Sequence, residues 1–426
     1  MKTLIKIFLT IVFSSSFNVS NASTLLDSLN SAYLNNPKLN AERASARAAT
    51  EEKREAVSEF LPSITVSGYV SEIENTNPGV DTNFRPAEQS ITVEQKIFQG
   101  FSGVSNFKKQ KHGQTLAEFQ LGKIVQEILL AAAEAHTELL LNKKKVDINL
   151  VNIDLIERQV ETDQNRLEKG EISLTDLAQS EASLAGARAE LITAQNDLVS
   201  SRANFENIIG KKPSENIKDV KESNLILPTS LANAYKISNS ENPNLQISLL
   251  EFKQAKLDVL IAGSELSPSA TLSYKIAEQD DFSATVKDRT QQTVTATATW
   301  PLFAGGSNLF SLRKFQEFKN QKELLYEDSK KQNETDVASA WSSYQSSKSV
   351  LASIRAQVKA AEIANEGISL EYESGNSRTT LEVIQSNTVL LNSRINLASS
   401  ERNFLISQFN LLAAVGRLTA KQLNLK

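Results

Sequence analysis

The sequence holds few residues of the types that perform chemistry. Its 426 residues include no cysteine and only two histidines, His112 and His136. The missing cysteines exclude disulfides, thiolate metal sites and cysteine nucleophiles. The two histidines are 24 positions apart, too far to share a metal-binding helical turn. Neither a glycine-rich phosphate loop nor a Gly-x-Ser-x-Gly motif occurs. We therefore expect no enzyme, no cofactor and no metal site, with each histidine either solvated or between helices.

The overall charge indicates which partners are disfavoured, and the N-terminus predicts where the chain is sent. The 50 acidic residues outnumber the 46 basic ones, which argues against a nucleic-acid partner. Lys2 and Lys6 precede the short apolar run 7–17, and Ser20-Asn21-Ala22 supplies small residues for cleavage. This pattern predicts a signal peptide over residues 1–22. No later stretch reaches the roughly 18 apolar residues of a spanning helix. An exported chain of this kind is either soluble or part of a β-barrel.

The elements that would position any site occur twice. Asn36-Pro37-Lys38-Leu39 recurs as Asn242-Pro243-Asn244-Leu245, at an offset of 206 residues. Further pairs of landmarks keep an offset of 205 or 206: Pro62 and Pro268, Gly170 and Gly375, Gly210 and Gly416. The order of these landmarks predicts an internal duplication, with a first copy over 23–225 and a second over 226–426.

Each copy is expected to contain long helices. No proline occurs in 87–212 or in 302–426, and proline is strongly disfavoured inside helices. A seven-residue repeat of apolar side chains marks a helical seam that ends near 210 in the first copy and near 416 in the second. Its members are Leu177, Leu184, Leu191, Leu198 and Phe205, then Val383, Leu390, Leu397, Phe404 and Leu411. The preceding 65 or so residues of each copy would form a helix about 100 Å long.

Two segments of alternating polar and apolar residues precede the long helix in each copy. They predict strands at about 63–75, 87–98, 269–279 and 290–303. Such alternation suits a barrel with lipid outside and water inside, and equally a soluble sheet with one packed face. Four strands cannot close a barrel, so strands in a membrane would require several chains, and three chains would supply 12 strands. The predicted fold class is therefore α+β.

The order of these features resembles the TolC family of outer-membrane efflux and type I secretion ducts. The resemblance is carried by Asn-Pro-x-Leu before each strand pair, by the strand exit at 302–306, and by the glycine-acidic segment 170–177. It implies a homotrimer with a shared 12-stranded barrel in the outer-membrane lipid and a tunnel of coiled helices in the periplasm. A periplasmic adaptor and an inner-membrane ABC or proton-driven transporter would dock there and open this passive conduit.

The same resemblance suggests gate residues. The latch at the tunnel end would involve Asp176 and the weaker candidate Thr175 in the first copy, with Tyr372 and Arg378 in the second. Asp176 could equally be a helix N-cap, and Tyr372 and Arg378 could be solvated surface residues. An extra residue near Asn376-Ser377 shifts the register before Arg378.

Glu382 is expected in a ring of charge at the constriction. Three copies of this carboxylate would favour cations. The second acidic position of the family pattern is Gln385 here, so one ring is expected and not two.

Two questions stay open at this point. The chain could instead be a periplasmic coiled-coil scaffold or a surface stalk without a pore. If it is a duct, its cargo could be drugs or a secreted protein, and the closing Gly416-Arg417-Leu418-Thr419 leans mildly towards secretion.

Overall fold

A computed structural model describes residues 24–77, 80–214, 217, 225–283, 286–374 and 378–425, and the statements below concern these residues. The predicted signal peptide, 1–22, lies outside them. So do Gly375, Asn376 and Ser377, where the sequence predicts the extra residue.

The chain is built from long helices and short strands in a repeated order. The first copy contains α1 (Leu25–Asn35), α2 (Pro37–Ser58), β1 (Ser63–Val70), β2 (Ile73–Asn77), β3 (Val80–Phe84), β4 (Ala87–Gln99), α3 (Ser102–Glu168) and α4 (Leu174–Ile209). The second contains α5 (Leu231–Glu241), α6 (Pro243–Ser264), β5 (Ser269–Ser283), β6 (Val286–Thr299), α7 (Ser307–Glu373) and α8 (Thr380–Ala414). Each helix of the second copy begins 205 or 206 residues after its counterpart, which confirms the predicted duplication.

The Asn-Pro motif sets the start of α2 and of α6. The side-chain oxygen of Asn36 accepts a hydrogen bond from the Leu39 backbone N–H at 3.2 Å, and Asn242 accepts one from Leu245 at 3.2 Å. Pro37 occupies the first helical turn, where its missing N–H has no intrahelical partner to lose. The motif therefore ends one helix and begins the next within a single residue.

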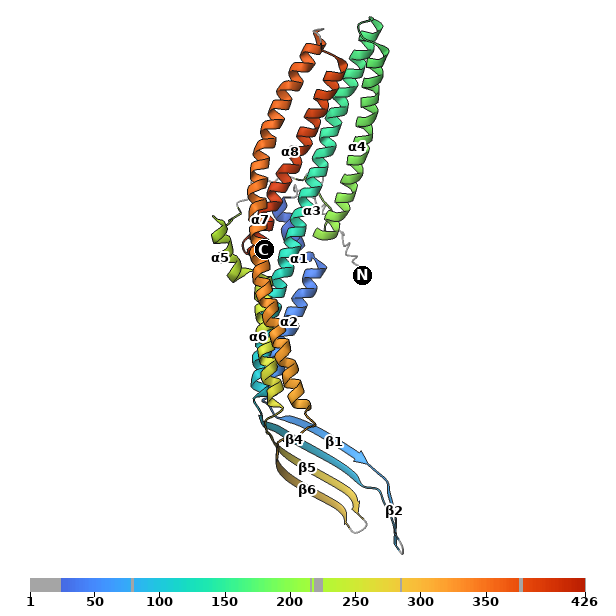
Figure 1. Cartoon of the computed structure of the whole chain (residues 1–426). Coiled ribbons are helices and arrows are strands. Elements are labelled where there is room, and N and C mark those ends of the chain that lie inside the picture. Colours follow the sequence, from blue (N-terminus) through green and yellow to red (C-terminus); the bar gives the residue numbers. More distant parts are fainter. Residues whose placement is uncertain are drawn as a thin grey trace, which may run out of the picture. The chain divides into compact units, whose positions relative to one another are not determined.

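The strands form a four-stranded antiparallel sheet in the order β1-β4-β5-β6, and β2 and β3 form a separate two-stranded ribbon (Figure 1). The single strand predicted at about 63–75 is two strands, because pairing with β4 ends at Val70 and the chain then enters the ribbon. The last strand ends at Thr299 and not near 303, before Pro301, which has no N–H to donate to a ladder.

Contacts between Cα atoms divide the chain into two compact units. Unit 1 comprises the described parts of Met1–Ser31, Ala132–Asn224 and Ala361–Ala398; unit 2 comprises those of Ala32–Ala131, Leu225–Ala360 and Ser399–Lys426. Both units contain segments of both copies. Within unit 2, Ala234 and Ile237 of α5 pack with Val337 of α7 and Leu411 of α8, all of them from the second copy.

The helical seam of α4 differs in one respect from the predicted heptad. Phe205 is buried, but the leucines before it are only half-buried. The residues of α4 that are buried at seven-residue spacing are small ones: Ser180, Ala187, Ala194 and Ser201. Small side chains let helices approach closely, so they occupy the centre of this contact while the leucines flank it.

Candidate functional site

The two faces of the four-stranded sheet differ in chemistry. One row across the sheet joins Ile64, Val93, Tyr274 and Val294, and the next joins Val66, Ile91 and Ile276. Val66 and Val294 are 75% and 70% exposed, as expected for a face that covers no core of its own chain. We call this the apolar sheet face. The opposite face carries Ser, Thr, Glu and Lys side chains, and we call it the polar sheet face.

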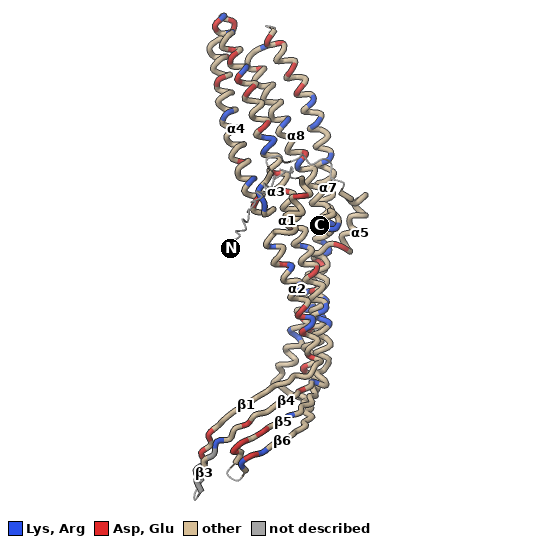
Figure 2. Tube along the Cα trace, turned by 180° about the vertical axis from the view of Figure 1, so that it is seen from behind, with Lys and Arg blue, Asp and Glu red and all other residues tan. Residues whose placement is uncertain are grey.

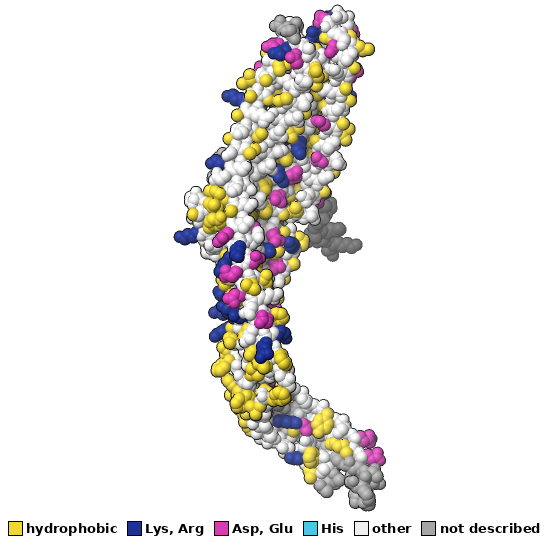
Figure 3. All heavy atoms as spheres, viewed as in Figure 1, with side chains coloured by type: hydrophobic (Ala, Val, Ile, Leu, Met, Phe, Trp, Pro, Cys, Tyr) yellow, Lys and Arg dark blue, Asp and Glu magenta, His cyan; other side chains and the backbone are white. Residues whose placement is uncertain are grey.

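A cluster of exposed aromatic side chains lies where the strands meet the helices. Its members, the junction aromatics, are Phe60, Phe98, Phe101, Trp300, Phe303 and Phe310. Trp300 donates its indole N–H to the Leu266 carbonyl at 3.1 Å, and Phe98 and Phe101 meet edge to face. Figure 3 shows hydrophobic side chains gathered over the ends of α6 and α7 next to the sheet. Exposed aromatics beside an apolar strand band are typical of the membrane–water boundary.

Among the residues that the structure describes, none of the helices combines the length and apolar character that crossing a bilayer would require.

The predicted latch residue Asp176 lies at the start of α4, in unit 1. Its carboxylate accepts hydrogen bonds from the Ser173 backbone N–H at 2.9 Å and from the Ser173 hydroxyl at 2.7 Å, and the Ser173 hydroxyl in turn accepts from the Asp176 N–H. These bonds form a capping box and hold the pKa of Asp176 below its usual value. The N-cap is therefore Ser173. The alternative that Asp176 is the N-cap is wrong, because Asp176 is the third residue of the helix. Thr175 beside it is exposed.

Glu382 occupies the equivalent place in the second copy, 206 residues after Asp176. Its carboxylate accepts from the Thr379 backbone N–H at 2.8 Å and from the Thr379 hydroxyl at 3.2 Å. Arg378 also binds it at 3.1 Å and binds Glu371 at 2.6 Å. These bonds lower the pKa of Glu382, and the bond from the Thr379 N–H has the largest effect. Gln385 follows on the same helix and is exposed.

Tyr372 is buried at the end of unit 1 that carries both helix turns, and it is not a solvated surface residue. It is 2% exposed, and its hydroxyl donates to Oδ1 of Asp163 at 2.5 Å. The hydroxyl also lies 3.0 Å from the Thr380 hydroxyl. Burial, and then the bond to Asp163, raise the pKa of Tyr372. A predicted latch residue is thus held inside the chain.

Asp163 is the centre of this buried network. Its side chain is fully buried, and its carboxylate accepts hydrogen bonds from Gln159 at 2.8 Å, from Tyr372 and from Ser180. Because Asp163 lies on α3, Ser180 on α4, Tyr372 on α7 and Thr380 on α8, all four long helices meet around one carboxylate. A buried carboxylate requires such donors, because burying a polar group without hydrogen-bond partners is costly.

Arg166 covers the network from the side. Its guanidinium lies 4.4 Å from the centre of the Tyr372 ring and binds Glu171 at 3.2 Å. It also donates to the Tyr372 carbonyl at 3.4 Å. Arg166 therefore joins the end of α3, the α3–α4 turn and α7, while Figure 2 shows acidic positions at that turn.

The structure thus brings Tyr372 together with Asp163, Ser180 and Thr380, which the sequence analysis missed. Asp176 and Arg378 each bond within their own turn. The capping pattern Ser/Thr-x-x-Asp/Glu, present at 173–176 and at 379–382, could have indicated the role of Asp176 and Glu382. A second seven-residue repeat could have indicated Ser180, because the small residues at 180, 187, 194 and 201 recur as Ser386, Ser393, Ser400 and Ser407.

The two histidines differ in their surroundings. His136 is fully buried in unit 1, and its Nδ1 lies 2.9 Å from the Ser28 hydroxyl. Burial lowers the pKa of His136 to about 4, so the ring is neutral at pH 7. His112 is not fully buried, and its pKa is lowered mainly by partial burial. Among the described residues, no group of three His, Asp or Glu side chains is placed to hold a metal ion.

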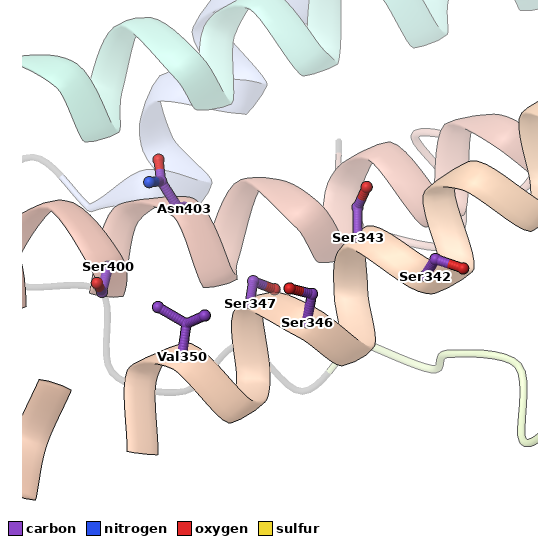
Figure 4. A pocket seen from close by; sticks show the side chains of 7 residues that line it. All are labelled: Ser342, Ser343, Ser346, Ser347, Val350, Ser400 and Asn403. Carbon is purple, nitrogen blue, oxygen red and sulfur yellow. The ribbon is translucent and has the colours of Figure 1, made fainter. Parts of the chain in front are cut away.

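An open groove between α7 and α8 in unit 2 has a volume of about 470 Å³. It is lined almost entirely by small polar side chains, among them Ser343, Ser346, Ser347 and Asn403 (Figure 4). The Ser347 hydroxyl lies 2.7 Å from that of Ser407 at the helix contact. Among the described residues that line the groove, none is charged, and their small side chains leave the surfaces of both helices open to packing.

Comparison with known proteins identifies the family. A sequence profile described as "Outer membrane efflux protein" matches residues 28–211 and 234–417, two segments offset by 206. The outer membrane efflux protein BepC of Brucella suis is 26% identical over 406 residues, covering 95% of this chain and 88% of that protein. The outer membrane protein TolC of Vibrio cholerae is 24% identical over 432 residues, covering 98% and 96%. In fold, the chain is similar to the Campylobacter jejuni CmeC outer membrane channel, with a TM-score of 0.82, 13% identity and coverage of 93% and 86%.

These matches extend over both copies, and they decide against the periplasmic scaffold and the surface stalk. The family consists of channel proteins, which agrees with an apolar sheet face bordered by junction aromatics. The chain belongs to the outer membrane efflux protein family, the TolC-like channels, and is an efflux channel of the outer membrane.

Proposed function

We propose that three copies of the chain assemble into one duct, with four strands from each copy closing a 12-stranded barrel. The observation that carries this is the open sheet: in the order β1-β4-β5-β6, strands β1 and β6 have a partner on one side only in the described part of the chain. An unpaired edge in lipid leaves N–H and C=O groups without partners. Pairing β6 of one copy with β1 of the next satisfies both edges at once.

The duct is a passive conduit that works with an inner-membrane transporter and a periplasmic adaptor. The adaptor would bind the helices, and the transporter, of the ABC or the proton-driven class, would supply the energy. Membership of the family supports this arrangement. The serine-lined groove on α7 and α8 is a surface where a further helix could pack closely.

The cargo is not indicated by the closing segment. Gly416 has a φ of +86°, and Arg417 binds Glu241 through two bonds of 2.7 and 2.9 Å. These residues therefore have a structural role at the end of α8. Because these structural contacts explain why Gly416 and Arg417 are present, the two residues do not favour protein secretion over drug efflux.

The test of the duct is its assembly and conductance. Protein extracted from outer membranes in mild detergent should have the mass of a trimer and should form ion-conducting pores in planar lipid bilayers. A monomer in the periplasmic extract, or a trimer that never conducts, would contradict the proposal. The chain has no cysteine, so cysteines introduced into β1 and β6 would report on pairing between copies without background.

The gate is proposed at the turns of unit 1. The latch would involve Asp176, Thr175, Tyr372 and Arg378, and the constriction would carry Glu382 with Gln385 one turn further on. The positions of Asp176 and Glu382 in equivalent capping boxes support a shared place at the two turns. In the chain, Arg378 neutralises Glu382, so the ring would gain charge only when Arg378 moves to another partner.

Replacing both Asp176 and Arg378 by alanine should raise the single-channel conductance. Asp176→Ala removes the two bonds that its carboxylate accepts from Ser173, and Arg378→Ala removes both ion pairs of the second turn, so both turns loosen. Because Glu382 also loses its cation, the double variant should prefer cations more strongly than the unsubstituted duct. Arg54→Ala on α2, which removes an exposed pair with Glu51, is the control for loss of a surface arginine. Unchanged conductance in the double variant would refute the latch assignment.

A further inference from the structure

The polar sheet face carries one charged cluster that the efflux function does not explain. It lies toward the ends of the strands away from α2 and α6, where Figure 2 shows acidic and basic positions gathered. Glu88 of β4 accepts a hydrogen bond from the Lys275 ammonium at 2.6 Å and from the Gln279 amide at 2.7 Å, both on β5. Each carboxylate oxygen therefore has a donor on β5, and both oxygens of Glu88 are held in place.

The strand register places this cluster on the polar sheet face. Glu88 lies opposite Gln279, and Ser90 lies opposite Ala277. Lys275 lies opposite Thr92, two rows along the polar sheet face from Glu88. Its side chain therefore lies along the sheet to reach the Glu88 carboxylate. Ser90 and Ala277, between them on the same face, are 6% and 4% exposed. The lysine therefore lies along the wall and does not project away from it.

Because the side chain of Glu88 is buried, its carboxylate needs the ammonium group of Lys275 as a partner. The side chain of Glu88 is 9% exposed in a single chain, whereas that of Lys275 is 43% exposed. A carboxylate withdrawn from water requires a nearby positive charge and hydrogen-bond donors. Because nearly half of the Lys275 side chain is in contact with water, its ammonium group does not need the Glu88 carboxylate as a partner in the same way. The pair thus cancels two charges while leaving the cation next to the solvent on that face.

We propose that Glu88 and Lys275 form a charge-compensating pair on the inner wall of the duct near its outer mouth, and that this pair sets the ion preference there. The inference rests on the proposed trimeric barrel, because only closure of the sheet turns the polar sheet face into a lumen wall. Three copies would place three cancelled pairs around one opening. Loss of either member would add three uncompensated like charges to this part of the wall, which also carries Arg289 in the row of Glu88 and Gln279. Rings of like charge make pores selective.

The test compares single and double substitutions in planar bilayers, with the cation-to-anion permeability ratio as the readout. Lys275→Gln should shift the ratio toward cations and Glu88→Gln toward anions, each by about twofold or more. The double variant Glu88→Gln/Lys275→Gln should return to the ratio of the unsubstituted duct, because its net charge there is the same. Lys275→Arg, which keeps the pair, should also leave the ratio unchanged.

Two controls separate the possible failures. Glu278→Gln removes a carboxylate from the same strand but on the opposite face, and it should not change the ratio. If Lys275→Gln does not assemble, because Glu88 is left without its cation, Glu88→Gln and the double variant still give the two decisive ratios. A conducting trimer in which Glu88→Gln has no effect, or the double variant stays shifted, overturns this proposal. A chain that forms no conducting trimer contradicts the duct itself.

Discussion

Replacing Asp163 by alanine should loosen the end of unit 1 and raise the single-channel conductance of the duct. The substitution leaves the hydroxyls of Ser180 and Tyr372 buried without their acceptor, and it removes the contact shared by α3, α4 and α7. Removing one member of a buried, hydrogen-bonded charged network costs about 3–5 kcal/mol. We expect a lower thermal midpoint in detergent and pores that remain open longer.

Two milder substitutions at the same network separate gating from folding. Asp163→Asn keeps the shape and one acceptor oxygen, and should cost only about 1–2 kcal/mol. Tyr372→Phe keeps the ring beneath Arg166 but removes the hydroxyl that joins Asp163 to Thr380. If the network holds the gate closed, Tyr372→Phe should raise conductance although the trimer remains stable. A stable Tyr372→Phe trimer with unchanged conductance would limit the network to a role in folding.

The second large effect is expected for Gly416→Ala, which should prevent normal folding at the end of α8. A Cβ at this position would lie 2.3 Å from the backbone oxygen of Glu241 and 2.7 Å from the Asn242 nitrogen. The φ of +86° adds backbone strain for any other residue. Since neither backbone can move without breaking the α5–α6 junction, we expect a loss of about 4 kcal/mol or more.

Gly170→Ala is the matched control for this prediction. Gly170 has a φ of +73°, but nothing lies within 4 Å of its Cβ position. It should therefore show the backbone strain alone, about 1–2 kcal/mol. Arg417→Gln removes the half-exposed pair with Glu241 and should cost only about 1 kcal/mol or less. The stability of all three variants is measured by thermal unfolding followed with circular dichroism and by the amount of detergent-resistant trimer on gels. Equal losses of stability for Gly416→Ala and Gly170→Ala would contradict the steric argument.

Much of the fold could be predicted from the sequence because its signals are local and occur twice. The Asn-Pro motif, the proline-free stretches and the offset of 206 residues determine where the helices begin and how the copies correspond. The ribbon of β2 and β3 was missed because the residues between Val70 and Ala87 lack a clear alternation of polar and apolar types. Local pattern could not show where β1 leaves its partner.

The gate region was less predictable, for a physical reason. Asp163 lies in the last two turns of α3 among many polar residues, and its sequence neighbours do not distinguish it from exposed acids. Its partners come from 17 and 209 residues away, and only tertiary packing shows that these side chains are buried together. Asp176 was singled out by a family pattern, whereas the carboxylate that holds Tyr372 in this chain lies 13 residues earlier.

The pairing of the two copies within one sheet also has a consequence for biosynthesis. Strand β4 pairs with β5, and Ser269 lies 170 positions after Gln99. At roughly 5–20 residues per second, the first hairpin would wait about 10–35 s before its partner strand has been synthesised. During this time the edge of β4 that later pairs with β5 is open, and an open edge is prone to aggregation. The order of strands thus leaves the first hairpin with an open edge until the second half of the chain has been synthesised.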